Sequence, residues 1–313
     1  MFYNRDWLTD PQHQAAYSER FGTPLAVPLT WAELDRQMAF FHAPDAGRYG
    51  GSLFRNLNYI AWEFWSRLHG QGIYPLSDDM EPRLSTPEAL AALTQLIAAN
   101  DALAPDVWSA GLFDNFAAFA EGNRYCNIGW GGTQKHLHTS PMRERLAFGP
   151  LPGGVLGGSP VAMPYFNWGW NYVVSARTSI AQLAHLFILF ATTPHVSTRS
   201  VREASGYFDP FRPDHYTDPV IVETYGADFL KVHQESLSAC IPDLYLRGQG
   251  RYLQVLKQAV HSAALGQLTP EQALSALNDR WQRLTDELGR DSQIEQWRYL
   301  RRSYPASLQA LLT

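Results

Sequence analysis

The sequence predicts a helix-rich α/β protein. Apolar residues recur at three- and four-residue spacing over long stretches, most regularly near the C-terminus, and this is the pattern of amphipathic helices. Short apolar stretches beside glycine and aromatic residues lie between them and predict strands. With 313 residues, of which 45% are hydrophobic, the chain is long enough for one large domain or two lobes.

The first elements are defined by their turn and cap residues. Residues 1–3 predict the end of a strand, and residues 10–20 predict a polar helix. Residues 23–28 are bounded by prolines and predict an extended linker. Thr30 and Glu33 have the spacing of a capping box, in which the hydroxyl and the carboxylate satisfy the first amides of a helix. We therefore expect a helix from this point to about residue 41.

Three helices and a strand follow. Between residues 55 and 69 the apolar side chains recur at helical spacing. Thr86 and Pro87 are typical of a helix start. The expected helices cover residues 55–69, 88–100 and 108–119, and a Gly turn and a short apolar strand that ends at Trp130 come next.

The chain changes character between residues 148 and 171, where glycines and prolines predict loops. A strand is expected over residues 168–175, and a helix over residues 179–191. The stretch 183–191 is the most apolar of the chain and predicts a buried helix, because it is too short to span a membrane. The remaining predicted helices cover residues 227–239, 251–266 and 271–288.

Charge and cysteine content narrow the function classes. The net charge is −5 and the isoelectric point is near 6.0, which argues against a nucleic-acid partner. Cys126 and Cys240 cannot form a metal framework; either one long-range disulfide or two free thiols fits them. The first residues lack the basic and apolar regions of a signal peptide.

Two local patterns are weak signals for other sites. His136-Leu137-His138 has no obvious third ligand nearby, so we expect no metal site and no cofactor. The glycine pairs at 153–154 and 157–158 lack the lysine and the strand-to-helix setting of a phosphate loop, and they predict flexible loops.

Trp130 is the first candidate binding residue. Ligands of open α/β sheets bind at the carboxyl ends of strands, where the predicted strand places this indole. A flat aromatic ring suits the apolar face of a sugar ring.

The order of several segments resembles a known family. The segments are Tyr-Asn-Arg-Asp-Trp at residues 3–7, Pro-Leu-Thr-Trp-Ala-Glu at 28–33, the Phe-x-x-Gly element at 119–126, Pro-Leu-Pro-Gly at 150–153, the Gly-aromatic strand and Ala-rich helix at 168–191, and Gly-Gln-Leu-Thr-Pro-Glu-Gln-Ala-Leu at 266–274. In this order they resemble the extracellular solute-binding proteins of family 1, the maltose-binding-protein-like sugar-binding components of ABC importers.

The resemblance implies a fold and a domain organisation. The fold would be the α/β periplasmic-binding-protein-like two-lobe fold of type II, helix-rich and N-terminally truncated, because family members carry a further lobe and an export signal before residues 3–7. Residues 1–170 and 228–313 would form the C-terminal lobe, and residues 171–227 would cross the hinge into the N-terminal lobe. The parent protein would be periplasmic, or extracellular and lipid-anchored.

The resemblance also implies a non-catalytic function. The ligand would be a carbohydrate or polyol, held between the lobes by aromatic stacking and polar contacts, and the partner would be the ABC permease. The candidate ligand-binding residues are Tyr3, Trp130, Trp168, Trp170, Tyr252, Asn56, Tyr59, Asp114 and Arg212, with Asn58 beside them. The alternative for each ring is a core residue, and for each polar group a surface or cap residue.

Two other functions remain open at this point. Aromatic residues and carboxylates also line glycosidase clefts, and Glu63, Asp114 and Glu121 are the candidate carboxylates of such an enzyme. A truncated lobe that binds nothing is the other alternative, and its exposed cleft wall would favour association.

Overall fold

The computed structural model describes residues 1–166, 169, 171–206 and 208–313. At its centre lies a four-stranded sheet in the order β2-β3-β1-β4, in which β2 and β3 are parallel and the other neighbours antiparallel. The strands are β1 (Phe2–Asn4), β2 (Tyr49–Ser52), β3 (Arg124–Asn127) and β4 (Leu146–Phe148). Residues 1–3 were predicted as the end of a strand, and β1 confirms this.

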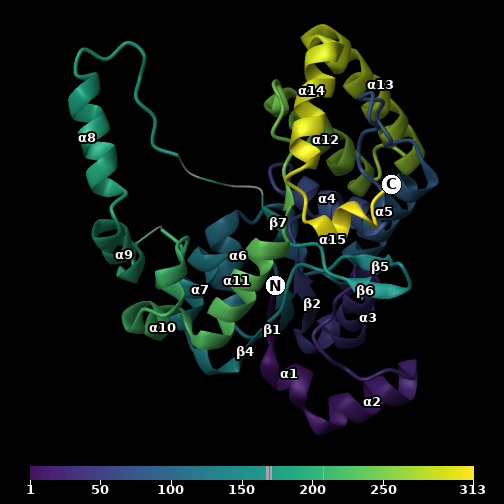
Figure 1. The fold of residues 1–313 in the computed structure, drawn as a ribbon. Helices are drawn as coiled ribbons and strands as arrows, with labels where there is room; N and C mark the ends of the chain where they lie inside the picture. The colour runs from purple at the N-terminus through teal and green to yellow at the C-terminus, as the bar shows by residue number, and fades with distance from the viewer. Residues whose placement is uncertain (167–168, 170, 207) are drawn as a thin grey trace.

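Helices cover both faces of this sheet (Figure 1). Successive strand residues point to opposite faces, so Tyr3 joins one apolar core and Phe2 another. The Tyr3 side is covered by α1 (Arg5–Thr9), α2 (Pro11–Phe21) and α3 (Trp31–Phe41), and the Phe2 side by α6 (Leu112–Ala120), α7 (Gly131–His138), α10 (Pro219–Tyr225) and α11 (Ala227–Ala239).

A second, helical layer holds the largest core. Its helices are α4 (Ile60–Gly70), α5 (Pro87–Ala98), α12 (Gln249–Ala264), α13 (Pro270–Leu288), α14 (Arg290–Arg301) and α15 (Ala306–Gln309). The apolar face expected on α13 is buried here, with Trp281 fully enclosed. Short elements complete the fold: η1 (Pro44–Ala46), η2 (Ala99–Ala102), η3 (Pro105–Trp108), η4 (Arg143–Arg145), η5 (Pro213–Tyr216), the β5 (Gly154–Leu156) and β6 (Ser159–Val161) hairpin, and the parallel pair β7 (Tyr165–Phe166) and β8 (Ile241–Pro242).

Local sequence signals set several boundaries correctly. The Thr30 hydroxyl accepts a hydrogen bond from the Glu33 amide at 3.2 Å, and the Glu33 carboxylate accepts one from the Thr30 amide at 3.1 Å. The capping box is therefore confirmed, and α3 ends at Phe41 as expected. α11 has the predicted bounds, and α12 and α13 lie within two residues of theirs.

Several sequence predictions of strands and helix starts were wrong. The helix expected from residue 55 begins at Ile60, because the Asn56 side chain accepts from the Asn58 amide and holds a turn there. The strand expected to end at Trp130 ends at Asn127, and Trp130 is instead the N-cap of α7, a helix that the sequence analysis did not predict. Residues 171–175 are not in a strand.

The most apolar helix is exposed, contrary to the expectation of burial. α8 (Ala181–Ala191) stands apart from the rest of the molecule (Figure 1), whereas α9 (Pro194–Arg202), which follows it, packs into the core on the Phe2 side through the fully buried Val201. Leu183, Leu186, Phe187, Leu189 and Phe190 of α8 are each 51–62% exposed. The helical pattern was correct, but nothing in the described part of the chain covers it. Among the described residues, no helix combines the length and the apolar character needed to cross a bilayer.

Candidate ligand-binding site

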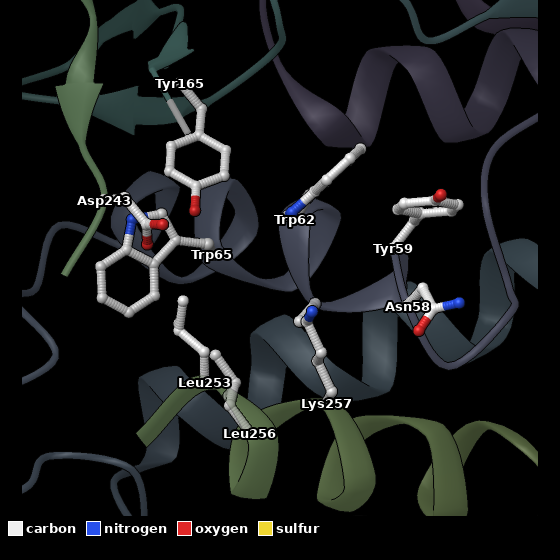
Figure 2. A pocket seen from close by; sticks show the side chains of 10 residues that line it. Asn58, Tyr59, Trp62, Trp65, Tyr165, Asp243, Leu253, Leu256 and Lys257 are labelled. Carbon is white, nitrogen blue, oxygen red and sulfur yellow. The ribbon is translucent and has the colours of Figure 1, made fainter. Parts of the chain in front are cut away.

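A cavity of about 280 Å³ lies between α4, α12 and the β7–β8 pair (Figure 2). Its size is close to the lower end of small-molecule pockets, which begin at about 300 Å³. Its walls combine aromatic and aliphatic side chains with polar groups, among them Asn58, Asp243 and Lys257. The lining residues are Asn58, Tyr59, Ala61, Trp62, Trp65, Tyr165, Asp243, Leu253, Leu256 and Lys257.

The aromatic wall comes from α4 and the loop before it. Trp62 and Trp65 are three residues apart, so both rings lie on the same side of the helix. Trp65 is fully buried and its Nε1 donates to the Pro242 carbonyl at 3.2 Å, which fixes α4 against β8. Trp62 is half-buried, and its ring centroid lies 4.8 Å from that of Tyr59. The wall thus has a fixed buried end and an aromatic pair closer to solvent.

The principal acceptor of the pocket is Asp243. It directly follows β8, at the carboxyl end of the strand. Its carboxylate accepts hydrogen bonds from the Leu244 amide and from Gln249 Nε2, both at 2.8 Å. Burial raises the pKa of the Asp243 carboxyl. Burial also raises the pKa of the Tyr165 hydroxyl, and the negative charge of the nearby Asp243 carboxylate raises it further. The group is held in place by the protein and directed to the same end of the cavity as the Tyr165 hydroxyl (Figure 2).

α12 supplies the opposite wall. Leu253, Leu256 and Lys257 are spaced three and four residues apart and therefore share one face of the helix. The Lys257 ammonium partly offsets the effect of burial on the Asp243 carboxyl, because its charge lowers that pKa. The pocket therefore combines ring faces with an acceptor carboxylate, a donor ammonium and the amide of Asn58. Such a set suits a neutral, polyhydroxylated molecule with an apolar face.

The structure brings two of the sequence candidates to this pocket. Tyr59 and its neighbour Asn58 line it. Asn56 does not; its Nδ2 donates to the Ala110 carbonyl at 2.6 Å, so it anchors the turn that positions Tyr59.

Tyr3 and Tyr252 lie in cores. Both are fully buried, and the Tyr252 hydroxyl pairs with the Thr285 hydroxyl at 2.9 Å. Both rings therefore have the surroundings of core residues, which is the alternative that the sequence analysis left open. Ligand contact at either ring remains a prediction.

Trp130, Asp114 and Arg212 are outside the pocket lining. Trp130 packs edge-on against Phe116 with the ring centroids 5.0 Å apart. Asp114 accepts from the Gly111 amide at 3.0 Å and caps α6. Arg212 donates to the Thr192 carbonyl at 2.6 Å, which ties it to the end of α8. Trp168 and Trp170 lie outside the described residues.

Sequence reasoning missed most of the pocket, above all Trp62, Trp65, Tyr165, Asp243 and Lys257. Helical spacing within each of α4 and α12 was visible in the sequence. The spacing does not show that these two helix faces, almost two hundred residues apart in the sequence, lie opposite each other in the fold.

The thiols and histidines form no further centre in the described part of the chain. Cys126 and Cys240 are free, which leaves the two-thiol alternative, and burial raises the pKa of both. No group of three or more potential metal ligands occurs among the described residues.

Comparisons with known proteins show the fold. No family model matches the sequence, and no curated protein matches it. Among solved structures, a solute-binding protein of an ABC transporter from Agrobacterium radiobacter K84, in complex with ribitol, has a TM-score of 0.72 at 20% identity and covers 90% of this chain. MalE3 of T. maritima, with bound maltose, has a TM-score of 0.69 at 20% identity and also covers 90%. An ABC transporter solute-binding protein from Agrobacterium vitis S4, with bound D-mannitol, has a TM-score of 0.71 at 18% identity and covers 92%.

The chain thus has the helix-rich α/β fold of the periplasmic-binding-protein-like class. It spans 68%, 69% and 70% of the length of these three structures. Two of the three are solute-binding proteins of ABC transporters, and all three hold a bound sugar or polyol.

Proposed function

We propose that this chain is the sugar- or polyol-binding component of an ABC importer, and that it does not catalyse a reaction. The observation that carries the proposal is the pocket between α4 and α12, where aromatic rings meet the fixed carboxylate of Asp243. Ring faces bind the C–H side of a sugar, and a carboxylate accepts from its hydroxyls. The ribitol, maltose and mannitol bound by the three neighbours belong to the same chemical class.

The remaining parts of the proposal follow from this class of protein. The parent protein works outside the cytoplasmic membrane, in the periplasm or tethered to the cell surface by a lipid. Besides the solute, its partner is the permease of the importer in the membrane. Two lobes close on the ligand, driven by contacts that are made only in the closed state, and the ligand is released when the lobes separate. Binding therefore involves no chemical conversion of the ligand.

The chain corresponds to the C-terminal lobe together with a segment that belongs to the N-terminal lobe. In this division the C-terminal lobe consists of residues 1–170 and 228–313, and the segment of the N-terminal lobe consists of residues 171–227. The exposed apolar α8 supports this division, because a helix with five large apolar side chains in solvent is expected to pack against further protein. The neighbours' greater length is consistent with an additional lobe.

The proposal is tested by titrating the protein with ribitol, D-mannitol and maltose while tryptophan fluorescence is recorded. We expect a saturable change with at least one of them. Trp62→Leu should abolish it, whereas Trp108→Leu, a matched change on η3 outside the pocket lining, should keep it. Saturation that survives Trp62→Leu unchanged would refute this pocket. Hydrolysis of a chromogenic glycoside would refute the non-catalytic role.

A second candidate function is a lobe that no longer binds a solute by itself. The exposed α8 favours it, since this surface promotes association of the isolated lobe. A flat response to all three ligands from a folded sample, with elution far above the monomer mass of 35.3 kDa, would favour this candidate over the first.

A further inference from the structure

Lys135 of α7 has an unusual set of partners for a lysine. It is 6% exposed, and its ammonium donates to the backbone carbonyls of Glu203, Gly206 and Phe208 at 2.9, 3.1 and 3.0 Å. These carbonyls belong to the return segment, which we define as described residues 203–206 and 208–209. A buried ammonium needs all its donors satisfied, and here one short stretch of backbone satisfies all three.

Asp209 holds the other end of the return segment. Its carboxylate accepts from the Gly132 amide at the start of α7 and from the Tyr225 hydroxyl, the latter at 3.2 Å. The approach to the helix is close, because a Cβ on Gly131 would lie 2.1 Å from Asp209 Oδ1. Glycine at residue 131 thus leaves room for the carboxylate at the N-terminal end of α7, where the helix dipole favours a negative charge.

Tyr225 and Gln134 close the arrangement. The Tyr225 hydroxyl shares its single proton between Asp209 and the Phe208 carbonyl, which lies at 3.1 Å, and Gln134 Nε2 donates to the Tyr225 carbonyl at 2.6 Å. The Lys135 ammonium lies over the Tyr225 ring, 5.4 Å from its centroid. The return segment is therefore held by side chains from α7 and α10 together.

This arrangement lies between α9 and Trp130. Trp130 is the N-cap of α7 and directly precedes Gly131. On the other side, the return segment follows α9, and Arg212 ties the chain after it to Thr192 and Ser197. The return segment is therefore the connection along the chain between α9 and the Arg212 contacts, and it is the part that contacts α7.

We propose that Lys135 and Asp209 are positioning residues that latch the return segment onto the N-terminal end of α7 and thereby set the placement of Trp130. The latch connects the chain that follows α8 and α9 to a residue that the sequence analysis places on the ligand side. The relevance of the latch to solute binding rests on the proposed function. The existence of the latch rests only on the contacts of Lys135 and Asp209.

The pKa of Asp209 gives the latch a pH dependence. Burial raises it from 3.8 to about 6 in the latched state, whereas a released, solvated carboxyl keeps its ordinary value. Protonation therefore favours the latched state, and the latch tightens as pH falls from 7.5 to 5. The charged and titratable groups facing Asp209 are Lys135, Tyr225 and Tyr216, with Glu203 beside Lys135.

The experiment measures how accessible Trp130 is to acrylamide in the full chain. The contribution of Trp130 is obtained as the difference between each protein and its Trp130→Phe counterpart. We expect Lys135→Met to raise the quenching constant of Trp130 at least two-fold at pH 7.5. Lys231→Met, which changes an exposed lysine on α11, should leave it unchanged.

A pH series separates positioning from general stability. In the parent protein the quenching constant should fall as pH drops from 7.5 to 5. Asp209→Asn, which mimics the neutral carboxyl, should remove that dependence, and Asp214→Asn, at an exposed position, should not. This comparison also separates Asp209 from His136, His138, His215 and His233, which all variants retain.

The proposal is overturned if folded Lys135→Met shows the parental quenching constant. Should that variant not fold, identical pH profiles in the parent and Asp209→Asn overturn it instead. Neither measurement uses a solute. Sugar titration of the same proteins tests the proposed function separately, so either idea can fail while the other stands.

Discussion

Glu63 of α4 belongs to an ion-pair network that connects the helical layer to the sheet layer. It is 3% exposed, and its two carboxylate oxygens accept from Arg55 at 2.6 Å and from Arg67 at 2.8 Å. Arg67 also donates to both oxygens of Asp35 on α3 at 2.7 Å, and its guanidinium lies 4.3 Å from the centre of the Trp31 ring. The charges of the two arginines keep the pKa of Glu63 below its ordinary value despite burial. Of the three carboxylates that the sequence offers for an enzymatic role, Glu63 has both oxygens engaged in these structural ion pairs.

Glu63→Gln should destabilise the fold strongly. The change leaves two buried guanidiniums with one carboxylate partner, Asp35, and breaking a buried ion pair costs about 3–5 kcal/mol. We expect a loss of that size in the unfolding free energy measured by urea denaturation. The exposed Glu19→Gln is the matched control and should change it by less than about 0.5 kcal/mol. A Glu63→Gln effect as small as the control would contradict this account of the network.

Asp243→Asn should weaken solute binding without changing the shape of the pocket. The amide keeps one acceptor oxygen but loses the charge, and hydrogen bonds to charged groups contribute about 1.5–3 kcal/mol. We therefore expect a roughly 10- to 100-fold rise in Kd for the sugar or polyol that binds, measured by calorimetry. Unchanged affinity would show that the carboxylate does not contact the ligand. A circular dichroism spectrum equal to that of the parent protein is the required control.

Among the elements, α8 differs most from what its composition requires. Its sequence contains no charged residue, and large apolar side chains face solvent on most of its circumference. A helix that is apolar all round is normally buried on all sides. The described part of the chain leaves it without such burial, so α8 is the surface through which the isolated chain is expected to associate.

Replacing Leu183 and Phe187 together by Gln should reduce that association. The double variant removes two apolar side chains that are 62% and 59% exposed, so it loses little packing within the chain. We expect a lower apparent mass in sedimentation and weaker binding of a hydrophobic dye, with the thermal midpoint changed by no more than about 2 °C. Gln182→Ala, on the same helix, is the control. A sharp fall in the thermal midpoint would mean that these side chains are packed in solution.

At the scale of the whole molecule, His69 joins distant parts of the chain. It is fully buried at the end of α4, where Nδ1 pairs with the Trp65 carbonyl at 2.8 Å and Nε2 with the Tyr304 hydroxyl at 3.0 Å. Burial lowers the pKa of this imidazole from 6.5 to about 4. The folded protein therefore holds His69 neutral at a pH where the unfolded chain is protonated.

This difference predicts acid destabilisation. Between pH 6.5 and 4 the unfolded state binds a proton at His69 that the folded state does not, so the unfolding free energy decreases as pH falls through this range. The contribution of this residue reaches about 3 kcal/mol at pH 4, from about 1.36 kcal/mol per unit of pKa difference. Urea denaturation at pH 7, 6, 5 and 4 measures it. His69→Gln should flatten the profile by that amount, and a parallel profile would contradict the assignment.

Elements with local signals could be predicted from the sequence. The hydroxyl and carboxylate of Thr30 and Glu33 satisfy each other's amides, and the apolar face of α13 follows from a 3.6-residue period, so neither depends on distant contacts. The helix-rich α/β class followed from the same patterns. Tyr59, a candidate from the family resemblance, lines the pocket, and its contact with a ligand remains a prediction.

Which faces contact each other could not be predicted in this way, because it depends on long-range packing. The pocket needs α4, α12 and Asp243 together, and the latch needs Lys135 beside a backbone stretch about seventy residues away. Burial was decided at the same level: Tyr3 and Tyr252 lie in cores and α8 in solvent, although their local sequences predict only strand or helix. The physical reason is that hydrogen-bond and periodicity signals act over a few residues, whereas burial depends on what the rest of the chain brings to each face.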